Sequence, residues 1–380
     1  MTRVVLLTTG LARGGAESQV AQCAVALRRR GWETAVVSLL DPTAFAGELA
    51  AAAVPVHSLR MRPGRPDPRG LLRLMGFLRV FRPRILHSHM FHANLAARLV
   101  RLYCPVPVVI STLHSVAESS RDTNRVRLRD WAYRLTDPLA DLVTAVSLAV
   151  AERHRAGGAV GSARLRVIPN GVDTSRYRPD PARRENARHE LGIAARFVWL
   201  AAGRLMWKKD YATLLRAFAR QADAVLLIAG EGPEGDQLRH QARELAIDAR
   251  FLGAREDLPA LMNAADGFVL SSVVEGLPMV LIEAAASGLP AVAADAGGVR
   301  ECVADGETGF VVPSADAGAL AAAMSRLAAA PAETRARLSH AARARAVERF
   351  DLETVVEEWE CTYGEMLARA AGAEGMRQWT

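Results

Sequence analysis

The sequence predicts an α/β protein made of two domains. Its 380 residues are too many for one ordinary domain and suit two of about 190 each. Short apolar runs alternate with amphipathic segments, which is typical of a mostly parallel sheet with helices on both faces. Several of these runs end in Gly-rich turns, and such sheets bind ligands beyond the carboxyl ends of their strands.

Composition places the chain among soluble globular proteins, since 50% of its residues are hydrophobic and 23% are charged. No segment approaches the ~20 uncharged apolar residues of a membrane span, and the apolar run 4–7 is far shorter than a signal sequence requires. The four cysteines share no metal or redox spacing, which suggests a reducing compartment. We therefore expect a cytoplasmic protein.

Charge divides unevenly along the chain. Residues 1–190 hold 29 Arg, no Lys and 15 acidic residues, a balance of +14, whereas the whole chain carries +7. The remainder is therefore at −7, and such a split indicates two units with different partners. The basic half suits anionic lipid or a phosphorylated acceptor. The alternative is that the Arg content reflects genome composition.

The first half begins with a strand over 4–8, a Gly-rich turn and a helix to about residue 30, an arrangement by which backbone can approach phosphate. Histidines follow two later strands: His114 comes directly after one, while His87, His89 and His92 have no metal-ligand spacing and are expected to be structural. The further strands are predicted at 34–38, 56–58, 85–88, 108–112 and 142–145.

Two basic segments stand out, 60–69 and 121–134, the second with Trp131 and Tyr133 among five Arg. Such segments bind a membrane surface, an acceptor glycan or a nucleic acid, or else form a solvated helix face. The turn pair Asn170-Gly171 then ends the first unit, and the polar stretch 176–188 carries the chain across.

The second half starts with a strand over 197–202, followed by Gly203-Arg204 and, five residues after Arg204, Lys209. Lys208 and Lys209 are the only lysines beside 46 arginines, which suggests that a compact point charge is needed in this loop. Two cations at a strand end suit an arriving diphosphate. Further strand–turn units are predicted at 225–233 and 251–255, and closing helices at 316–328, 332–349 and 351–371.

Glu275 and Glu283 lie eight positions apart, with Pro278 between them suited to the first turn of a helix. The free N–H groups of Met279 and Val280 would then favour an anion. Two hydroxyl acceptors flanking an anion site fit a nucleotide-sugar. For two carboxylates alone, ordinary solvated helix-end charges are the alternative.

Taken together, these motifs resemble the retaining GT-B glycosyltransferases of family 4, the glycosyl transferases group 1. The resemblance is carried by the Glu-x7-Glu pair and by segments at 169–173, 203–209, 230–233 and 288–310. It implies a GT-B fold, two Rossmann-like domains facing across a cleft. The expected domains are an acceptor domain at 1–170, a linker at 171–195, a donor-binding domain at 196–350 and a returning helix at 351–380.

The resemblance also implies roles for individual residues. Glu275 and His114 would hold the transferred sugar, Glu283 the ribose, and Arg204 and Lys209 the diphosphate. Asp210 replaces the glycine that usually follows the lysine. Because no Asp-x-Asp is present, no metal is expected, and the two cations would meet the leaving-group charge. The remaining expected donor contacts are Gly15, Arg255, Leu277, Met279 and Val280.

The implied reaction moves a sugar, with retention, from a nucleoside-diphosphate donor to a hydroxyl of a glycan or lipid-linked acceptor, as in surface polysaccharide synthesis. A UDP-sugar is favoured over GDP-mannose, and a peripheral position at the inner face of the membrane is expected. A GT-B sugar-nucleotide epimerase is the alternative, separable by product analysis with and without acceptor. An anionic-polymer-binding module would leave the paired glutamates and the lysine pair unexplained.

Overall fold

The computed structural model describes residues 1–64, 67–116, 123–193 and 196–377. The chain divides into two compact units, each considered by itself below. Unit 1 comprises Met1–Gly171 and Leu352–Thr380, and unit 2 comprises Val172–Asp351. Arg65 and Arg121, which belong to the two basic segments of the sequence, lie outside the described residues.

Unit 1 is built on a parallel sheet with the strand order β3-β2-β1-β4-β5-β6-β7. Counted outward from the central pair β1 and β4, the strands follow chain order in both directions. The connections that leave the carboxyl ends of β1 and β4 therefore run toward opposite edges of the sheet. The strands are β1 (Arg3–Thr8), β2 (Glu33–Ser38), β3 (Val56–Ser58), β4 (Ile85–His89), β5 (Val108–Leu113), β6 (Leu142–Ala145) and β7 (Leu165–Val167).

The helices of unit 1 begin with conventional signals. Asp67 caps α3 by accepting from the N–H of Arg69, with Pro68 at the first position, and Ser147 caps α6 through Val150. The helices are α1 (Gly15–Arg29), α2 (Ala46–Ala51), α3 (Pro68–Phe81), α4 (Phe91–Val100), α5 (Thr123–Thr136), α6 (Leu148–Ala156) and α15 (Leu352–Arg377), with short 3-10 turns η1 (Asp137–Leu139) and η2 (Ser162–Arg164).

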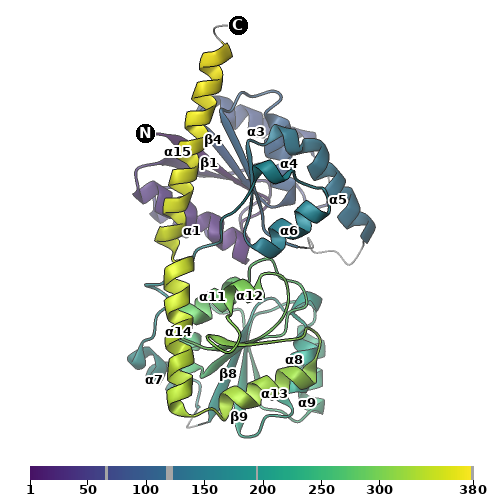
Figure 1. Cartoon of the computed structure of the whole chain (residues 1–380), viewed down its shortest axis with the longest axis vertical. Helices are drawn as coiled ribbons and strands as arrows, with labels where there is room; N and C mark the ends of the chain where they lie inside the picture. The colour runs from purple at the N-terminus through teal and green to yellow at the C-terminus, as the bar shows by residue number, and fades with distance from the viewer. Residues whose placement is uncertain (65–66, 117–122, 194–195, 378–380) are drawn as a thin grey trace. The chain divides into compact units, whose positions relative to one another are not determined.

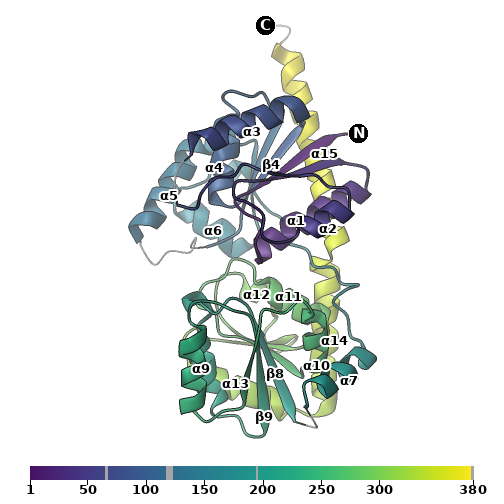
Figure 2. The ribbon, with the colours of Figure 1, turned by 180° about the vertical axis from the view of Figure 1, so that it is seen from behind.

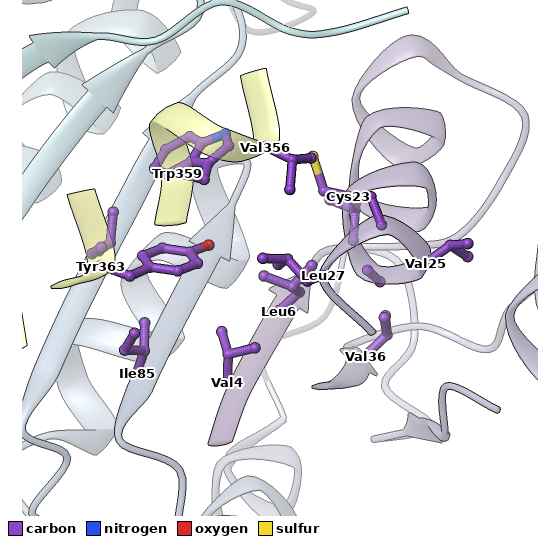
Figure 3. Close-up of a cluster of buried hydrophobic side chains, with 14 of the residues drawn as sticks. Val4, Leu6, Cys23, Val25, Leu27, Val36, Ile85, Val356, Trp359 and Tyr363 are labelled. Carbon is purple, nitrogen blue, oxygen red and sulfur yellow. The ribbon is translucent and has the colours of Figure 1, made fainter. Parts of the chain in front are cut away.

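Alternate residues of the central strands fill two cores, one on each face of the sheet. Val4 and Leu6 face α1 and α15, and Figure 3 shows Trp359 and Tyr363 of α15 over the same strands. Val5 and Leu7 face the opposite core, which α3 and α4 complete. Figure 1 shows α15, in yellow, running along unit 1 beside α1. The last helix of the chain is therefore part of the first unit's core.

Unit 2 has a second parallel sheet, with the order β10-β9-β8-β11-β12-β13. Because β8 lies beside β11, the loops that follow these two strands emerge at the same edge. The strands are β8 (Phe197–Ala202), β9 (Ala224–Ala229), β10 (Ala249–Gly253), β11 (Gly267–Leu270), β12 (Ala291–Ala294) and β13 (Gly309–Val312).

Helices cover both faces of this sheet as well. Figures 1 and 2 show α8 and α9 on one side of β8 and β9, with α7 on the other. Trp199, Leu226 and Phe218 are buried in the core under α8, α9 and α13. The helices are α7 (Pro181–Glu190), α8 (Tyr211–Phe218), α9 (Gly235–Glu244), α10 (Leu258–Ala264), α11 (Met279–Ala286), α12 (Val299–Cys302), α13 (Ala317–Ala328) and α14 (Ala332–Phe350), with the 3-10 turn η3 (Trp207–Lys209).

Two details differ from the sequence-based expectation. The polar stretch expected to be a connector contains α7, which Asp180 caps and which Arg184 and Arg188 tie to Asp266. Pro278 lies one position before α11 rather than inside its first turn. Within the described ranges, no helix has a stretch both long and apolar enough to cross a bilayer.

Candidate functional site

The loops at one edge of the unit 2 sheet are in close backbone contact, and glycines make this contact feasible. Gly230 has φ +142°, and a Cβ built there would lie 2.0 Å from the carbonyl oxygen of Gly203. A Cβ on Gly232 would lie 2.3 Å from the carbonyl oxygen of Leu205. The Leu205 N–H donates to the carbonyl of Glu231 at 2.9 Å. The Gly-Glu-Gly segment therefore supports the loop that carries Arg204 and Lys209.

Lys209 ends the turn η3, directly before α8. Asp210 has φ 43°, in the left-handed region, and its carboxylate accepts from the N–H of Thr213. Left-handed backbone favours glycine, but Asp tolerates it and also caps a helix. This is a physical reason why Asp210 can stand where the resembled family has glycine. The replacement leaves the backbone path after Lys209 intact.

Lys209 and Glu275 form an ion pair, with Nζ 2.6 Å from Oε1. Their side chains are only 20% and 10% exposed. Both backbones are fixed nearby: the Ser271 hydroxyl donates to the carbonyl of Lys209 at 2.7 Å, and the Val273 N–H donates to that of Lys208 at 2.8 Å. The family resemblance implies separate ligand groups for the two side chains, and no motif in the sequence indicates their direct contact.

Glu275 is held from a second side by the loop before α12. Gly297 has φ 53°, and a Cβ there would lie 1.9 Å from the Glu275 carbonyl oxygen. The Gly298 N–H donates to the carbonyl of Gly276 at 3.0 Å. Leu277 is buried, while Met279 and Val280 are half-buried at the start of α11. Pro278 supplies no side-chain cap to this helix, so the N–H groups of its first turn receive no cap bond from that residue.

Glu283 lies one turn inside α11 and is half-buried. Burial raises the pKa of its carboxyl to about 7, and the nearby Arg176 charge and a hydrogen bond with Tyr177 oppose that rise. The Tyr177 hydroxyl has its own pKa raised by burial and by Glu283. Tyr177 follows the Pro-Asn-Gly-Val-Asp segment, which gives that segment a side-chain contact to the second glutamate of the pair. No sequence signal pointed to this contact.

Of the two arginines expected to contact the donor, one is exposed and the other is paired with a carboxylate. Arg204 is exposed directly after β8, and it has no ion-pair partner within the described ranges. Arg255 instead pairs with Asp257, with bonds of 2.7 and 2.5 Å. Its guanidinium is thus occupied by a neighbouring carboxylate. Beside it, the Ala254 N–H donates to the carboxylate of Glu231 at 3.3 Å.

In unit 1 the structure brings three histidines together. His114 is half-buried, and its Nε2 lies 3.1 Å from Nδ1 of the buried His89. The His89 and His87 rings are 4.1 Å apart between centroids. His87 is enclosed between the Tyr363 hydroxyl at 2.6 Å and Thr112 Oγ1 at 2.7 Å. These partners support the structural role expected for His87.

Burial lowers the pKa of these imidazoles, to about 4 for His114 and to about 3 for His87. At neutral pH they are therefore uncharged and act as neutral hydrogen-bonding groups. Gly15, the other unit 1 residue singled out, is the exposed first residue of α1, and Gly14 stands at the N-cap without a side-chain bond. Unit 1 therefore has the start of α1 and the imidazole of His114 after the carboxyl ends of its strands, and unit 2 has the start of α11 after β11.

Chemically, the unit 2 edge combines a free guanidinium, a lysine held by a carboxylate and the start of a helix. These groups stabilise negative charge, as a diphosphate would bring. Among the described residues no group of three or more His, Cys, Asp or Glu could hold a metal ion. The acceptors Glu275 and Glu283 on either side of the helix start suit hydroxyl groups.

The known proteins that resemble this chain fit that chemistry. The family model of glycosyl transferases group 1 matches residues 183–345, and that of Glycosyltransferase Family 4 matches residues 13–176. The D-inositol 3-phosphate glycosyltransferase of Saccharomonospora viridis is 32% identical over an alignment of 401 positions, which spans 94% of this chain and 91% of that protein.

A second relative is matched over only part of its length. The GDP-mannose-dependent alpha-(1-6)-phosphatidylinositol monomannoside mannosyltransferase of Mycolicibacterium smegmatis is 38% identical over 208 residues. The match covers 50% of this chain and 54% of that relative, so the chain spans about half of it.

Among solved structures, Anabaena HepE in complex with UDP and glucose superimposes with a TM-score of 0.86 at 25% identity, over 96% of this chain and 100% of that one. Two parallel sheets, two family models that follow each other along the chain and a relative matched over nearly its whole length lead to one assignment. The chain belongs to the family 4 glycosyltransferases, the glycosyl transferases group 1, with the GT-B fold.

Proposed function

We propose that the enzyme transfers a sugar from a UDP-sugar, with retention at the anomeric carbon, to a hydroxyl of a glycan or lipid-linked acceptor. The observation that carries this proposal is the Lys209–Glu275 ion pair, in the loops before α8 and α11, together with the exposed Arg204 five residues before Lys209. The Glu275 carboxylate holds the Lys209 ammonium in position, and a ligand with more negative charge would then compete for that ammonium. A diphosphate is such a ligand.

In this proposal, the donor diphosphate attracts Lys209 and Arg204, and Glu275 turns to the hydroxyls of the sugar. Charge on the diphosphate grows as the glycosidic bond breaks, so the two cations stabilise the transition state more than the ground state. The start of α11 at Met279 and Val280, with Leu277 before it, adds N–H groups to the same anion. No metal ion is needed for this step.

Glu283 is assigned the ribose hydroxyls, and the 253–255 segment the base. Because Arg255 is paired with Asp257, base recognition there would use backbone groups. In unit 1, His114 is assigned a hydrogen bond to the sugar, and Gly15 an approach to the diphosphate. The half-buried, uncharged imidazole of His114 suits a hydroxyl rather than an anion.

Uridine is favoured because the HepE structure that contains UDP resembles this chain over 96% of its length. The match to the mannosyltransferase named for GDP-mannose covers only 50% of this chain. The +14 balance of residues 1–190 supports a position at an anionic membrane surface and, with it, a lipid-linked acceptor. Surface polysaccharide or glycoconjugate synthesis would need such an enzyme.

A thermal-shift panel tests the donor directly. UDP and a UDP-sugar should raise the Tm, because a ligand at 100 times its Kd stabilises by about 2.7 kcal/mol. GDP and GDP-mannose should raise it less. A larger shift with GDP-mannose would reverse the base preference, and no shift with any nucleotide would overturn the proposal.

A further inference from the structure

Helix α5 of unit 1 exposes a row of large apolar side chains. Leu128 is 64% exposed, Trp131 60% and Leu135 64%. Their spacing of three and four residues places them on one face of the helix. An exposed Trp between two exposed Leu on a single helical face differs from the scattered apolar residues of an ordinary surface.

The opposite face of α5 holds the helix firmly on unit 1. Tyr133 is 1% exposed, and its hydroxyl accepts from Asn94 Nδ2 of α4 at 3.1 Å. Asp130 forms two bonds, of 2.5 and 2.9 Å, with the guanidinium of Arg153 in α6. The outward direction of the apolar row is therefore set by these inner contacts on two neighbouring helices.

Cationic side chains run along one border of this row. Arg127 and Arg134 each precede a leucine of the row, are seven residues apart and are exposed. An angular step of about 100° per residue places them at the edge of the apolar face. They belong to the half of the chain whose balance is +14.

An apolar face that contains Trp and has an Arg border is typical of helices lying in the plane of a bilayer surface. A nucleic acid would contact the arginines and leave the leucines in water. An anionic lipid surface satisfies both: headgroups meet the guanidinium groups, and the acyl boundary receives the apolar side chains.

We propose that α5 is an interfacial helix, which inserts Leu128, Trp131 and Leu135 into an anionic bilayer surface while Arg127 and Arg134 contact its headgroups. This inference rests on the membrane location in the proposed function, but not on the donor site. It predicts two separable components of binding, one sensitive to salt and one resistant to it.

Co-sedimentation of the full chain with vesicles measures both components. The vesicles are phosphatidylcholine alone or phosphatidylcholine with phosphatidylglycerol, each at low and at high salt. Changing Leu128, Trp131 and Leu135 together to Ser should weaken binding on the order of 10–100-fold at both salt concentrations. Arg127→Ser with Arg134→Ser should weaken it about 25-fold at low salt, about fivefold per residue, and little at high salt.

The matched control uses Leu72 and Val80 of α3, which are 64% and 84% exposed. Leu72→Ser with Val80→Ser should leave vesicle binding unchanged, and an equal loss there would overturn the assignment to α5. Lipids brominated on their acyl chains should quench the fluorescence of wild-type protein more than that of Trp131→Phe. Equal quenching of the two proteins would show that Trp131 does not enter the bilayer.

Two more outcomes would overturn the inference. One is binding to nucleic acid without binding to vesicles. The other is a wild-type dimer in solution that the triple Ser variant dissociates, which would make the row an interface between copies. The UDP thermal shift, measured on every variant, separates the proposals: an unchanged shift without vesicle binding removes only the interfacial helix, and vesicle binding without any shift removes only the donor assignment.

Discussion

In unit 1 three histidines at the carboxyl ends of neighbouring strands lie against one another, whereas in unit 2 a lysine and a glutamate at the sheet edge carry opposite charges and form a pair. His89 lies 3.1 Å from His114, and Lys209 lies 2.6 Å from Glu275. Burial without a counter-charge suppresses the charged form, and burial with one preserves it. A ligand at the unit 2 edge therefore meets charged side chains, whereas a ligand at these unit 1 histidines meets uncharged imidazoles.

Acidification should separate the two units most strongly. Burial lowers the pKa of His87 to about 3 and that of His154 to about 4. Between those values and pH 6.5 only the unfolded chain binds these protons, so the unfolding free energy of unit 1 should fall as pH falls. The slope is about 1.4 kcal/mol per pH unit for each such histidine.

Glu283 should act in the opposite direction in unit 2. Its pKa is raised to about 7, so between pH 7 and its ordinary value the folded state binds the proton, and acidification should add stability. Amide hydrogen exchange at pH 5 and 7, corrected for intrinsic rates, should show β4 and β5 losing protection relative to β8 and β11. His154→Gln should reduce the slope of unit 1 alone. A common direction in both units would refute the contrast.

Within unit 1, removal of a buried tryptophan should cost far more stability than removal of an exposed one. Trp359→Ala empties a site in the core beneath α15, where the ring is 5% exposed, and should lower the unfolding free energy by about 3–5 kcal/mol. Trp131→Ala, at 60% exposure, should change it by less than about 0.5 kcal/mol. Urea denaturation measures both. A loss for Trp359→Ala as small as that for Trp131→Ala would mean that α15 contributes little to the first core.

Loss of one lysine should test the charged edge of unit 2. Lys209→Ala removes the cation that the proposed mechanism places on the leaving diphosphate, so kcat should fall by roughly 10²–10³. The kcat of Arg204→Ala should fall by a similar factor. Lys208→Ala is the matched control and should lose far less. Steady-state kinetics with a UDP-sugar measures all three, and equal losses at Lys208 and Lys209 would contradict the assignment.

A smaller effect is expected at the turn beside that lysine. Asp210→Ala loses the cap of α8 and puts a Cβ-bearing residue without a local hydrogen bond into left-handed backbone, which should lower the unfolding free energy by about 1–3 kcal/mol. Asp210→Gly relieves the backbone strain and should lower it by only a few tenths. The Tm of the two variants measures this. An Ala variant as stable as the Gly variant would refute the account of the turn.

The smallest expected effect is that of a chelator. If Arg204 and Lys209 meet the diphosphate charge, activity should be the same with and without EDTA. The assay is initial rate with a UDP-sugar, before and after addition of Mg²⁺ or Mn²⁺. An absolute requirement for either ion would contradict the cationic account of unit 2.

Much of the fold could be predicted from local pattern. The strand expected at 4–8 is β1 over Arg3–Thr8, and the helix expected at 316–328 is α13 over Ala317–Ala328. Helix α7 could not be predicted in this way, because its ten residues have no apolar stripe. It is held instead by Arg184 and Arg188 on Asp266, some 80 positions away in sequence. Long-range ion pairs leave no periodic signal.

The same limit applies to the site. Motifs selected Lys209 and Glu275 separately, but their contact depends on β8 lying beside β11, and strand order is not a local property. The bond between Glu283 and Tyr177 likewise joins segments about 100 residues apart. For Arg255 the motif indicated a donor contact, which stays a prediction, whereas only the structure shows that Asp257 occupies its side chain.

The lysine pair also makes this protein unusually accessible to amine chemistry. Lys208 and Lys209 are the only lysines of the 380 residues, so an acylating reagent selective for primary amines would modify, apart from the amino terminus, this loop alone. The ion pair with Glu275 holds the Lys209 amine against a carboxylate, so acylation there has to displace that contact, and a bound diphosphate would slow it further. Intact mass after brief acylation would therefore report the occupancy of this loop in the unaltered protein.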